Sequence, residues 1–211
     1  MFVRDYMTRN LITVDKKTGI FEALEIMKKH KIRQLPVVSA EGHLEGLVTE
    51  KELLTVSPSP ATSLSIYELN YLLAKMTVAE AMVKNPLTVT TDTTLEEAAL
   101  LMREHKIGSV PVMEGGRIAG IITVTDIFDA LVKFFGYGKA GTRLVIESRD
   151  RVGLLADVTQ VVKEFGILIL GIISNAKENG NVEIMLRLNT GDPAPLAAAL
   201  ESRGFKVTYI N

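Results

Sequence analysis

The sequence predicts an α+β protein that contains an internal duplication followed by a third unit of a different kind. Residues 7–38 repeat at 82–113, where 13 of 32 positions are identical. Each copy continues into a glycine-bearing turn, an apolar strand and a helix that begins after a threonine. From residue 142 onward the pattern changes to short apolar strands and two helices. Self-similarity at a fixed offset indicates a duplicated structural unit, and 211 residues leave room for three small domains.

The first half of each copy predicts a short strand and an amphipathic helix. The strands are "LITV" and "PLTV". In the helices, apolar residues recur at the i, i+3, i+4, i+7 spacing of one buried stripe. These residues are Ile20, Ala23, Leu24 and Met27 in the first copy, and Leu95, Ala98, Ala99 and Met102 in the second. Thr94-x-x-Glu97 is a capping box for the second helix. Each helix ends at "HKI", where the macrodipole favours basic residues, so His30 and His105 are interpreted as helix-end residues rather than metal ligands.

The second half of each copy predicts a hairpin and a closing helix, which makes each unit a βαββα repeat. The first hairpin strand is "RQLPVV" or "GSVPVM", and it contains a proline. The turn into the closing helix reads Thr49-x-x-Glu52 in the first copy and Thr123-x-x-Asp126 in the second. Both patterns are capping boxes, which are common, so the turns alone leave open whether they are structural caps or parts of a binding site.

We place the first repeat at residues 1–56, a linker with a helix at 57–75, the second repeat at 76–135 and a hinge at 136–141. The Ser/Pro-rich start of the linker is typical of a loop. From Ile66 the apolar residues recur at helical spacing, and Ser65-x-x-Glu68 resembles another capping box.

Residues 142–211 predict a ferredoxin-like unit. The strands are "TRLVIES", "LILGIISNA", "NVEIMLRLN" and "KVTYI", and helices are expected at 153–165 and 194–203. The order βαββαβ over about 70 residues places both helices on one face of the sheet.

Composition narrows the classes of function. The net charge of −1 gives no reason to expect nucleic acid or a membrane as a partner. The absence of cysteine excludes disulfides, thiolate metal sites and a Cys nucleophile. The charged start "MFVRDYMTRN" argues against a secretory signal, and the longest apolar run, 165–173, is about half of the ~20 residues that span a bilayer. We expect a cytoplasmic protein without a metal site, and the absence of P-loop, H-E-x-x-H and G-x-S-x-G motifs argues against an enzyme.

The repeated unit resembles the CBS domain, and the pair resembles a Bateman module. The resemblance rests on "MTRNLITV", "HKIRQLPVV" and "GLVTEKELL" in the first copy and on "MVKNPLTV", "HKIGSVPVM" and "GIITVTDIF" in the second. The last unit resembles an ACT domain through "ESRDRVGLLADVTQVVKEFGILILGIIS". A CBS pair followed by one ACT domain is similar to the AcuB-like acetoin-utilisation regulatory proteins.

The CBS resemblance implies an adenine nucleotide as a regulatory ligand, such as AMP, ADP, ATP or S-adenosylmethionine, with no catalytic cofactor. The turn Thr would contact phosphate and the acid three residues later would bind the ribose diol, which suits the free amides of a helix N-terminus. Thr123 and Asp126 would do this in the second copy, with the backbone of residues 107–110 bordering the same ligand. At Thr49 and Glu52 we favour the plain cap. The implied nucleotide-binding residues are Thr123, Asp126, Ile107, Gly108, Ser109, Val110, Pro111, Thr88, Thr49, Glu52, Arg33 and Gln34.

The ACT resemblance implies amino-acid binding between two ACT copies, near Asp150, Val152, Gly153 and Leu154. Leu168 stands where many amino-acid-binding relatives have Asn, so an amino-acid site and a bare dimerisation surface remain equally open. The protein is therefore expected to be a homodimeric, ligand-sensing allosteric regulator of an unidentified partner protein. The alternatives are a structural dimerisation scaffold without a ligand and, less favoured, an enzyme.

Overall fold

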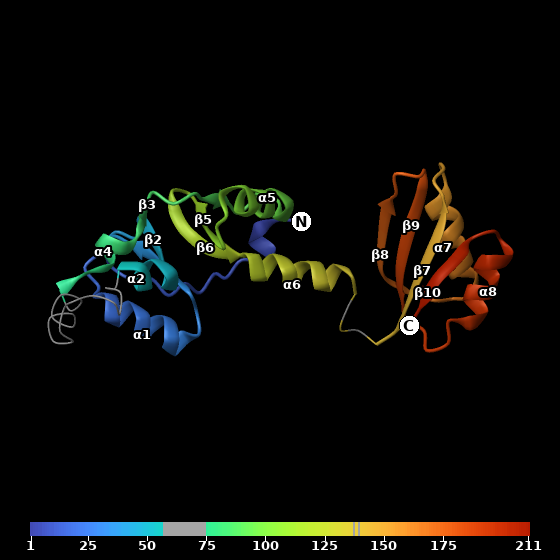
Figure 1. Ribbon diagram of the computed structural model, residues 1–211, viewed down its shortest axis with the longest axis horizontal. Helices are drawn as coiled ribbons and strands as arrows, with labels where there is room; N and C mark the ends of the chain where they lie inside the picture. Colours follow the sequence, from blue (N-terminus) through green and yellow to red (C-terminus); the bar gives the residue numbers. More distant parts are fainter. Residues whose placement is uncertain (57–74, 137, 139) are drawn as a thin grey trace. The chain divides into compact units, whose positions relative to one another are not determined.

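The computed structural model describes residues 1–56, 75–136, 138 and 140–211. They form two compact units, Met1–Ile127 and Phe128–Asn211 (Figure 1). The first unit holds the two repeats up to Ile127, and the second holds the rest of the closing helix of the second repeat together with the four-stranded sheet. The α+β class predicted from the sequence is confirmed. The helix expected from Ile66 and its cap lie outside the described residues.

Each repeat builds a hairpin flanked by helices, as the periodicity predicts. The first contains α1 (Ile20–His30), β1 (Gln34–Val38), β2 (Leu44–Thr49) and α2 (Glu50–Val56). The second contains β4 (Val89–Thr90), α5 (Leu95–His105), β5 (Ser109–Glu114), β6 (Arg117–Thr123) and α6 (Val124–Phe134). The predicted helix stripes are buried, since Ile20, Ala23 and Met27 lie in the core of the first repeat.

The opening strand of each repeat is shorter than the sequence suggests. The first-copy segment "LITV" forms only an isolated parallel bridge between Val14 and Val37, and β4 is two residues long. Val14 N donates to Pro36 O at 3.1 Å, and Val38 N donates to Val14 O at 3.0 Å. The next bond of a parallel ladder would need an N–H on Pro36, which proline lacks. Pro111 limits β4 in the same way, because Val89 pairs with Val112.

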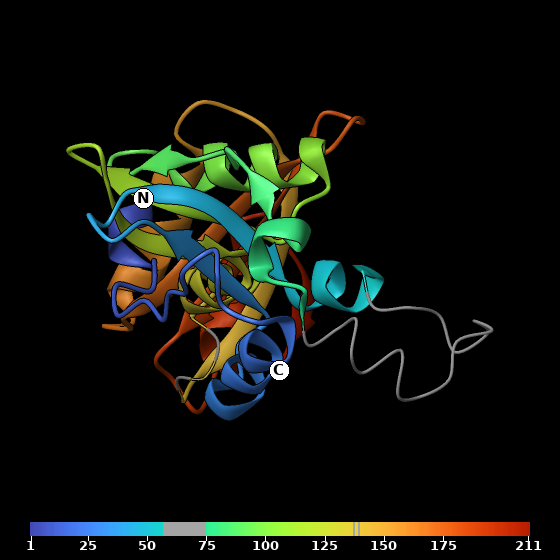
Figure 2. The ribbon, with the colours of Figure 1, turned by 90° about the vertical axis from the view of Figure 1, so that its left-hand side faces the viewer.

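The two repeats exchange the segments that precede their first strands. β3 (Val83–Lys84) belongs to the second repeat but pairs with β2 of the first, as Figures 1 and 2 show. Reciprocally, Thr8 bridges Ile121 of β6, with N···O distances of 2.9 and 3.0 Å. The exchange relates the two repeats by a pseudo-twofold arrangement.

Two equivalent glycines make this exchange possible. A Cβ at Gly46 would lie 2.6 Å from Met82 Sδ, and one at Gly120 would lie 2.7 Å from Met7 Sδ. The crossing segment therefore lies directly on the glycine in both repeats, and any side chain there would displace it.

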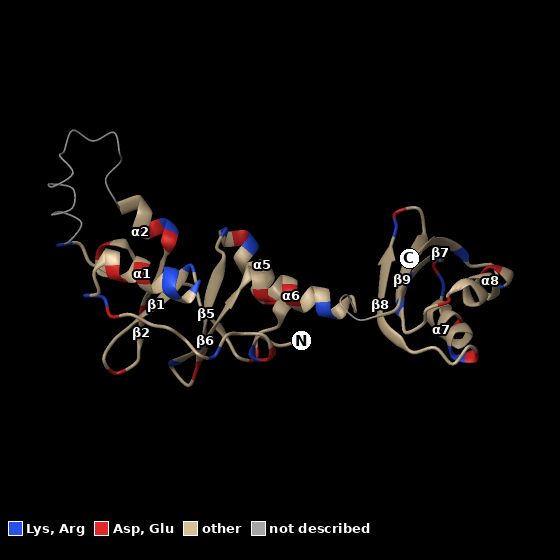
Figure 3. Cartoon of the chain, turned by 90° about the horizontal axis from the view of Figure 1, so that it is seen from below, with Lys and Arg blue, Asp and Glu red and all other residues tan. Residues whose placement is uncertain are grey.

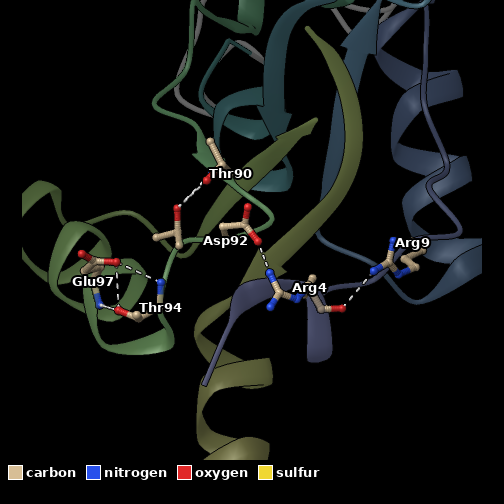
Figure 4. Close-up of polar contacts among 7 residues, drawn as sticks. Arg4, Arg9, Thr90, Asp92, Thr94 and Glu97 are labelled. Carbon is tan, nitrogen blue, oxygen red and sulfur yellow. Dashed lines mark hydrogen bonds and ion pairs between the residues drawn. The ribbon is translucent and has the colours of Figure 1, made fainter. Parts of the chain in front are cut away.

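A backbone hydrogen bond and an ion pair hold the segments next to these crossings in place. α4 (Val78–Ala81) packs into the core of the first repeat, and Val78 N donates to Thr18 O at 2.8 Å. The 3₁₀ turn Val3–Asp5 takes the equivalent place on the second repeat, where Arg4 pairs with Asp92 (Figure 4).

The capping box predicted at the start of α5 is confirmed. Glu97 Oε2 accepts from Thr94 N and Oγ1, each at 2.9 Å (Figure 4). These bonds to the Thr94 amide and hydroxyl hold the pKa of Glu97 below its usual value, because they stabilise the ionised carboxylate.

The second unit has the predicted βαββαβ order. Its elements are β7 (Thr142–Arg149), α7 (Leu154–Glu164), β8 (Ile169–Ala176), β9 (Asn181–Leu188), α8 (Ala194–Ser202) and β10 (Lys206–Ile210). The antiparallel sheet has the order β10-β7-β9-β8. α7 and α8 cover one face, with Leu144, Val158 and Leu196 in the core between the layers. β8 is an edge strand. α7 and α8 do not cover the opposite face of the sheet.

Candidate functional site

The second strand-to-helix turn is a complete capping box, and the first turn makes the carboxylate half of one. Asp126 Oδ2 accepts from Thr123 N at 2.7 Å and from Thr123 Oγ1 at 2.8 Å, and Asp126 N donates to Thr123 Oγ1 at 3.2 Å. Glu52 Oε2 accepts from Thr49 N at 3.0 Å and also from the Thr49 hydroxyl. The extra methylene of Glu52 does not prevent these two bonds, in which its carboxylate accepts from the Thr49 amide and hydroxyl. In each carboxylate a single oxygen receives these bonds, which leaves the other oxygen to accept from a ligand.

The first-copy turn opens onto a groove of about 410 Å³ built from both repeats. One wall comes from the end of β2 and the start of α2 in the first repeat. The other comes from the segment after β3 and from the α5–β5 connection of the second repeat. The lining residues are Leu47, Thr49, Lys51, Glu52, Val83, Asn85, Pro86, Leu87, His105, Lys106, Ile107, Gly108 and Ser109.

The segment exchange explains why two repeats meet here. β3 pairs with β2 through Leu47 and Val83, and β2 ends at Thr49. The residues that follow β3, Asn85 to Leu87, therefore lie beside the Thr49 turn. A single repeat could not form this groove.

The groove has the side chains that would bind a ligand of a particular kind. Such a ligand would carry hydroxyl groups, an anionic group and an apolar ring. Glu52 offers a carboxylate oxygen, which accepts strongly from hydroxyl groups. Lys51 and Lys106 supply positive charge, and Leu47 and Leu87 supply apolar surface. A volume of this size lies in the range of small-molecule sites.

Residues 107–109 lie beside both strand-to-helix turns. They line the groove with Thr49 and Glu52, and Thr123 and Asp126 are not among its lining residues. Gly108 O also accepts from Val124 N at 3.0 Å, and Ser109 pairs with Thr123 across β5 and β6. The expectation that the backbone of residues 107–110 borders a ligand at Thr123 and Asp126 stays a prediction.

The remaining predicted nucleotide residues lie near these turns or in the core. Val110 and Pro111 are buried in β5, and Thr88 is exposed beside the lining residue Leu87. Arg33 O accepts from Glu50 N at 2.9 Å, and Gln34 pairs with Thr49 across β1 and β2.

Sequence reasoning missed several groove residues. Asn85, Pro86 and Leu87 belong to the repeated "NPLTV" motif, and His105 and Lys106 belong to "HKI". Their recurrence in both copies is the signal that points to them, although the same residues also fit a strand and the end of a helix.

The predicted amino-acid turn of the last unit contains residues of different kinds. Gly153 precedes α7 with φ of +84°, so its left-handed backbone explains the glycine. Leu154 is a buried core residue. Val152 is fully exposed at 101% and Asp150 is exposed. The turn thus presents Asp150 and Val152 outward, while Leu154 anchors the helix.

Membrane-spanning helices and metal-binding clusters are two further features to consider in the described residues. No helix in the described parts of the chain combines the length and apolar character needed to cross a membrane. Across residues 1–56, 75–136, 138 and 140–211, no group of three or more His, Asp or Glu side chains is arranged to hold a metal ion.

Comparison with known proteins relates the chain to several curated relatives. It is 31% identical over 134 residues to a CBS domain-containing protein of Dictyostelium discoideum, covering 63% of this chain and 92% of the relative. An uncharacterized protein of Methanocaldococcus jannaschii is 27% identical, covering 99% of this chain and 55% of the relative. Inosine-5'-monophosphate dehydrogenase of Aquifex aeolicus is 35% identical over 123 residues, which cover 57% of this chain. The chain spans only 22% of that enzyme.

Solved structures match the first unit. CBSX2 in complex with AMP, a protein of Arabidopsis thaliana, is 32% identical with a TM-score of 0.52, covering 62% of this chain and 96% of that chain. A CBS domain pair in complex with 5'-methylthioadenosine and S-adenosyl-L-methionine is 28% identical with a TM-score of 0.52, covering 62% and 95%. An acetoin utilization protein (AcuB) from Vibrio cholerae is 29% identical with a TM-score of 0.53, covering 63% and 90%.

Family models account for both units. The CBS domain model matches residues 3–59 and 78–133, which is more than half of the chain, and the ACT domain model matches residues 142–203. The chain therefore belongs to the CBS domain family, with two tandem CBS domains followed by a C-terminal ACT domain.

Proposed function

We propose that this protein is a ligand-sensing regulator that binds an adenine nucleotide in its CBS pair. The observation that carries the proposal is the groove shared by the two repeats, which unites Thr49 and Glu52 with residues 107–109. The complexes of similar CBS pairs with AMP and with S-adenosyl-L-methionine support the choice of an adenosine-bearing ligand.

A nucleotide in this groove would use three kinds of contact. The free oxygen of Glu52 would accept from the ribose hydroxyls, as a carboxylate is the strongest acceptor for them. The apolar side chains of Leu47 and Leu87 would contact the base. The phosphates would lie toward Lys51 and Lys106, because opposite charges favour that orientation.

A second, pseudo-equivalent site follows from the repeat and is the stronger of the two. The repeat relates Thr49 to Thr123, Glu52 to Asp126 and Gly108 to Arg33. The bridge between Thr8 and Ile121 is the counterpart of the Val83–Leu47 pair in the first groove.

Arg33 and Asp126 then serve the same nucleotide. Arg33 adds a guanidinium that can bind phosphate through two parallel hydrogen bonds. Asp126 binds the ribose, and α6 directs the free amides of its first turn toward the phosphates. The first groove has Gly108 in place of the arginine, so its nucleotide affinity is lower.

The ACT unit joins two copies of the chain through β8. This edge strand carries no charged residue from Ile169 to Ala176 (Figure 3). Leu168 beside it is 66% exposed and Ile172 is 42% exposed. An uncharged apolar edge is a template for pairing with another strand. Closed twofold dimers are the commonest assembly, so a second copy is the partner we propose. An amino acid between the paired turns at Asp150 and Val152 is an additional ligand compatible with this dimer.

Binding of the nucleotide changes how the CBS pair contacts a regulated partner protein. A dimerisation scaffold without a nucleotide is the competing function. The observation that favours it is that the acid of each Thr-x-x-acid turn already accepts hydrogen bonds from the turn threonine.

Calorimetry and thermal unfolding of the full chain test the proposal. AMP, ADP, ATP and S-adenosylmethionine are titrated, with GMP as a matched control that changes only the base. At a hundred times Kd, a bound nucleotide stabilises the folded chain by about 2.7 kcal/mol. We expect heat and a raised melting temperature for at least one adenine ligand. No heat and no shift for any of the four would favour the scaffold.

A further inference from the structure

The residue that ends α5 has a left-handed backbone at the border of the groove shared by the two repeats. Lys106 has φ of +54° and ψ of +40°, a region that residues with a Cβ adopt only at a cost in free energy. Its amide closes the helix by donating to Met102 O and Arg103 O. Glycine is the usual residue at such a helix end. The sequence nevertheless has a lysine here, and Lys106 lines the groove.

The same backbone occurs at the equivalent position of the first repeat. Lys31 follows α1 with φ of +54° and ψ of +40°. Among the residues that the structure describes, Asn85 is the third non-glycine residue with a positive φ, at +49°, and it also lines the groove. Two of these three residues therefore border one cavity. Residues held in sparsely populated backbone regions cluster at functional sites, so this grouping points to a ligand.

The groove has a positive charge that the chain itself does not neutralise. Lys51 of the first repeat and Lys106 of the second line it, and Glu52 is the acidic residue in its lining. In the described part of the chain, neither lysine makes an ion pair. Glu52 Oε2 instead accepts from the Thr49 amide and hydroxyl. Two lysines against one glutamate leave one net positive charge, and His105 in the same lining adds another when it is protonated.

The adenosine-bearing ligands differ mainly in the charge of the group attached to the ribose. AMP, ADP and ATP carry successively more negative charge on their phosphates. S-adenosylmethionine carries a sulfonium in that position and an amino-acid group beyond it, and its net charge at neutral pH is positive. A positively charged groove attracts the first kind of ligand and repels the second. Selectivity is a difference between two affinities, and here attraction and repulsion increase it together.

We propose that Lys51 and Lys106 make the groove at Thr49 selective for phosphorylated adenine nucleotides over S-adenosylmethionine. This inference rests on the proposed nucleotide function and specifies the ligand class of one of its two sites. Lys106 is the specificity-determining residue contributed by the second repeat, and its side chain contacts the phosphates. The affinity of the groove falls in the order ATP, ADP, AMP and S-adenosylmethionine.

Calorimetry of the full chain with each of these four ligands tests the selectivity. Magnesium is left out and the ionic strength is kept low, because salt screens exposed charges. Lys106→Asn removes the charge with a residue that tolerates the left-handed backbone, so the melting temperature should not fall. We expect this variant to bind ADP about tenfold or more weakly at one of the two sites, which identifies the groove. Its affinity for S-adenosylmethionine should be unchanged or higher.

A second lysine provides the matched control. Lys84 is exposed on β3 next to the lining residue Val83, but it does not line the groove itself. Lys84→Met should leave all four affinities unchanged, and a loss equal to that of Lys106→Asn would refute the specific role of Lys106. Wild-type affinity for ADP in Lys106→Asn, or S-adenosylmethionine bound at the groove as tightly as ADP, would overturn the selectivity and leave nucleotide binding in place. Failure of all four ligands to bind would refute the proposed function itself, and the selectivity with it.

Discussion

Replacing Asp126 by alanine separates a binding role from a capping role at the second strand-to-helix turn. The side chain makes the cap bonds from Thr123 N and Oγ1 at 2.7 and 2.8 Å. In the proposed site it also binds the ribose of the nucleotide. Glu52→Ala is the matched control, because the Glu52 carboxylate accepts from Thr49 N in the other repeat as Asp126 does from Thr123 N.

The two roles differ in size and in what they change. Loss of a cap costs about 1 kcal/mol of stability, which lowers the melting temperature of a domain of this size by about 2–4 °C. Loss of charge-assisted hydrogen bonds to the ribose costs about 1.5–3 kcal/mol of binding free energy. That corresponds to about a ten- to hundredfold weaker adenine-nucleotide affinity. Both variants should therefore lose similar stability, but Asp126→Ala should lose more affinity at the tighter site.

The affinity for AMP is measured by calorimetry and the melting temperature by thermal unfolding, for the wild type and both variants. Unchanged nucleotide binding in Asp126→Ala, with the melting temperature lowered, would mean that the turn is only a cap and would refute the reasoning. Equal affinity losses in both variants would show that the two sites are equally competent, which contradicts the proposed ranking.

Three further perturbations test packing, electrostatics and assembly. Gly46→Ala should destabilise the chain by about 1–3 kcal/mol through overpacking, because the new Cβ would lie 3.0 Å from a backbone oxygen. Gly108→Ala is the control, because its Cβ would meet nothing within 4 Å, and it should leave the melting temperature unchanged. Glu147 has its pKa held below its usual value by a hydrogen bond from Asn181 and by nearby Lys177. Its stabilising contribution is therefore present above the ordinary carboxyl pKa of about 4.3 and is lost as the pH falls through the lowered pKa, so Glu147→Gln should flatten the acid limb of the stability curve. Light scattering at tens of micromolar should give a dimer for the wild type and a monomer for Ile172→Asp, and a monomeric wild type would refute the β8 interface.

Patterns local to one element could be predicted from the sequence. The helix stripe at Ile20, Ala23 and Met27 is buried because its spacing matches the helical period. The cap at Thr94 and Glu97 also follows from local spacing. The βαββαβ order of the last unit could be predicted because its strands are short segments rich in apolar and β-branched residues, such as "TRLVIES" and "KVTYI".

Contacts between repeats could not be predicted in the same way. The periodicity of a segment shows which of its faces is apolar. Both repeats offer equivalent apolar surfaces, so the periodicity does not show which repeat the crossing segment packs against. The pairing of Val83 with Leu47, and with it the grouping of residues 107–109 with Glu52, depends on that choice. The shortness of the opening strand could have been predicted from Pro36, which lacks a backbone N–H. Pro36 belongs to the partner strand and not to the opening strand itself.

Native mass spectrometry of the full chain during separate titrations with AMP, ADP, ATP and S-adenosylmethionine tests the central claim most directly, because it counts bound nucleotides on each assembly. The account predicts one tightly bound nucleotide per chain, a second at higher concentration, and loss of the first in Asp126→Ala and Arg33→Ala alike. A chain that retains no AMP, ADP, ATP or S-adenosylmethionine at any concentration tested would contradict it, as would an Arg33→Ala variant that keeps the tight site.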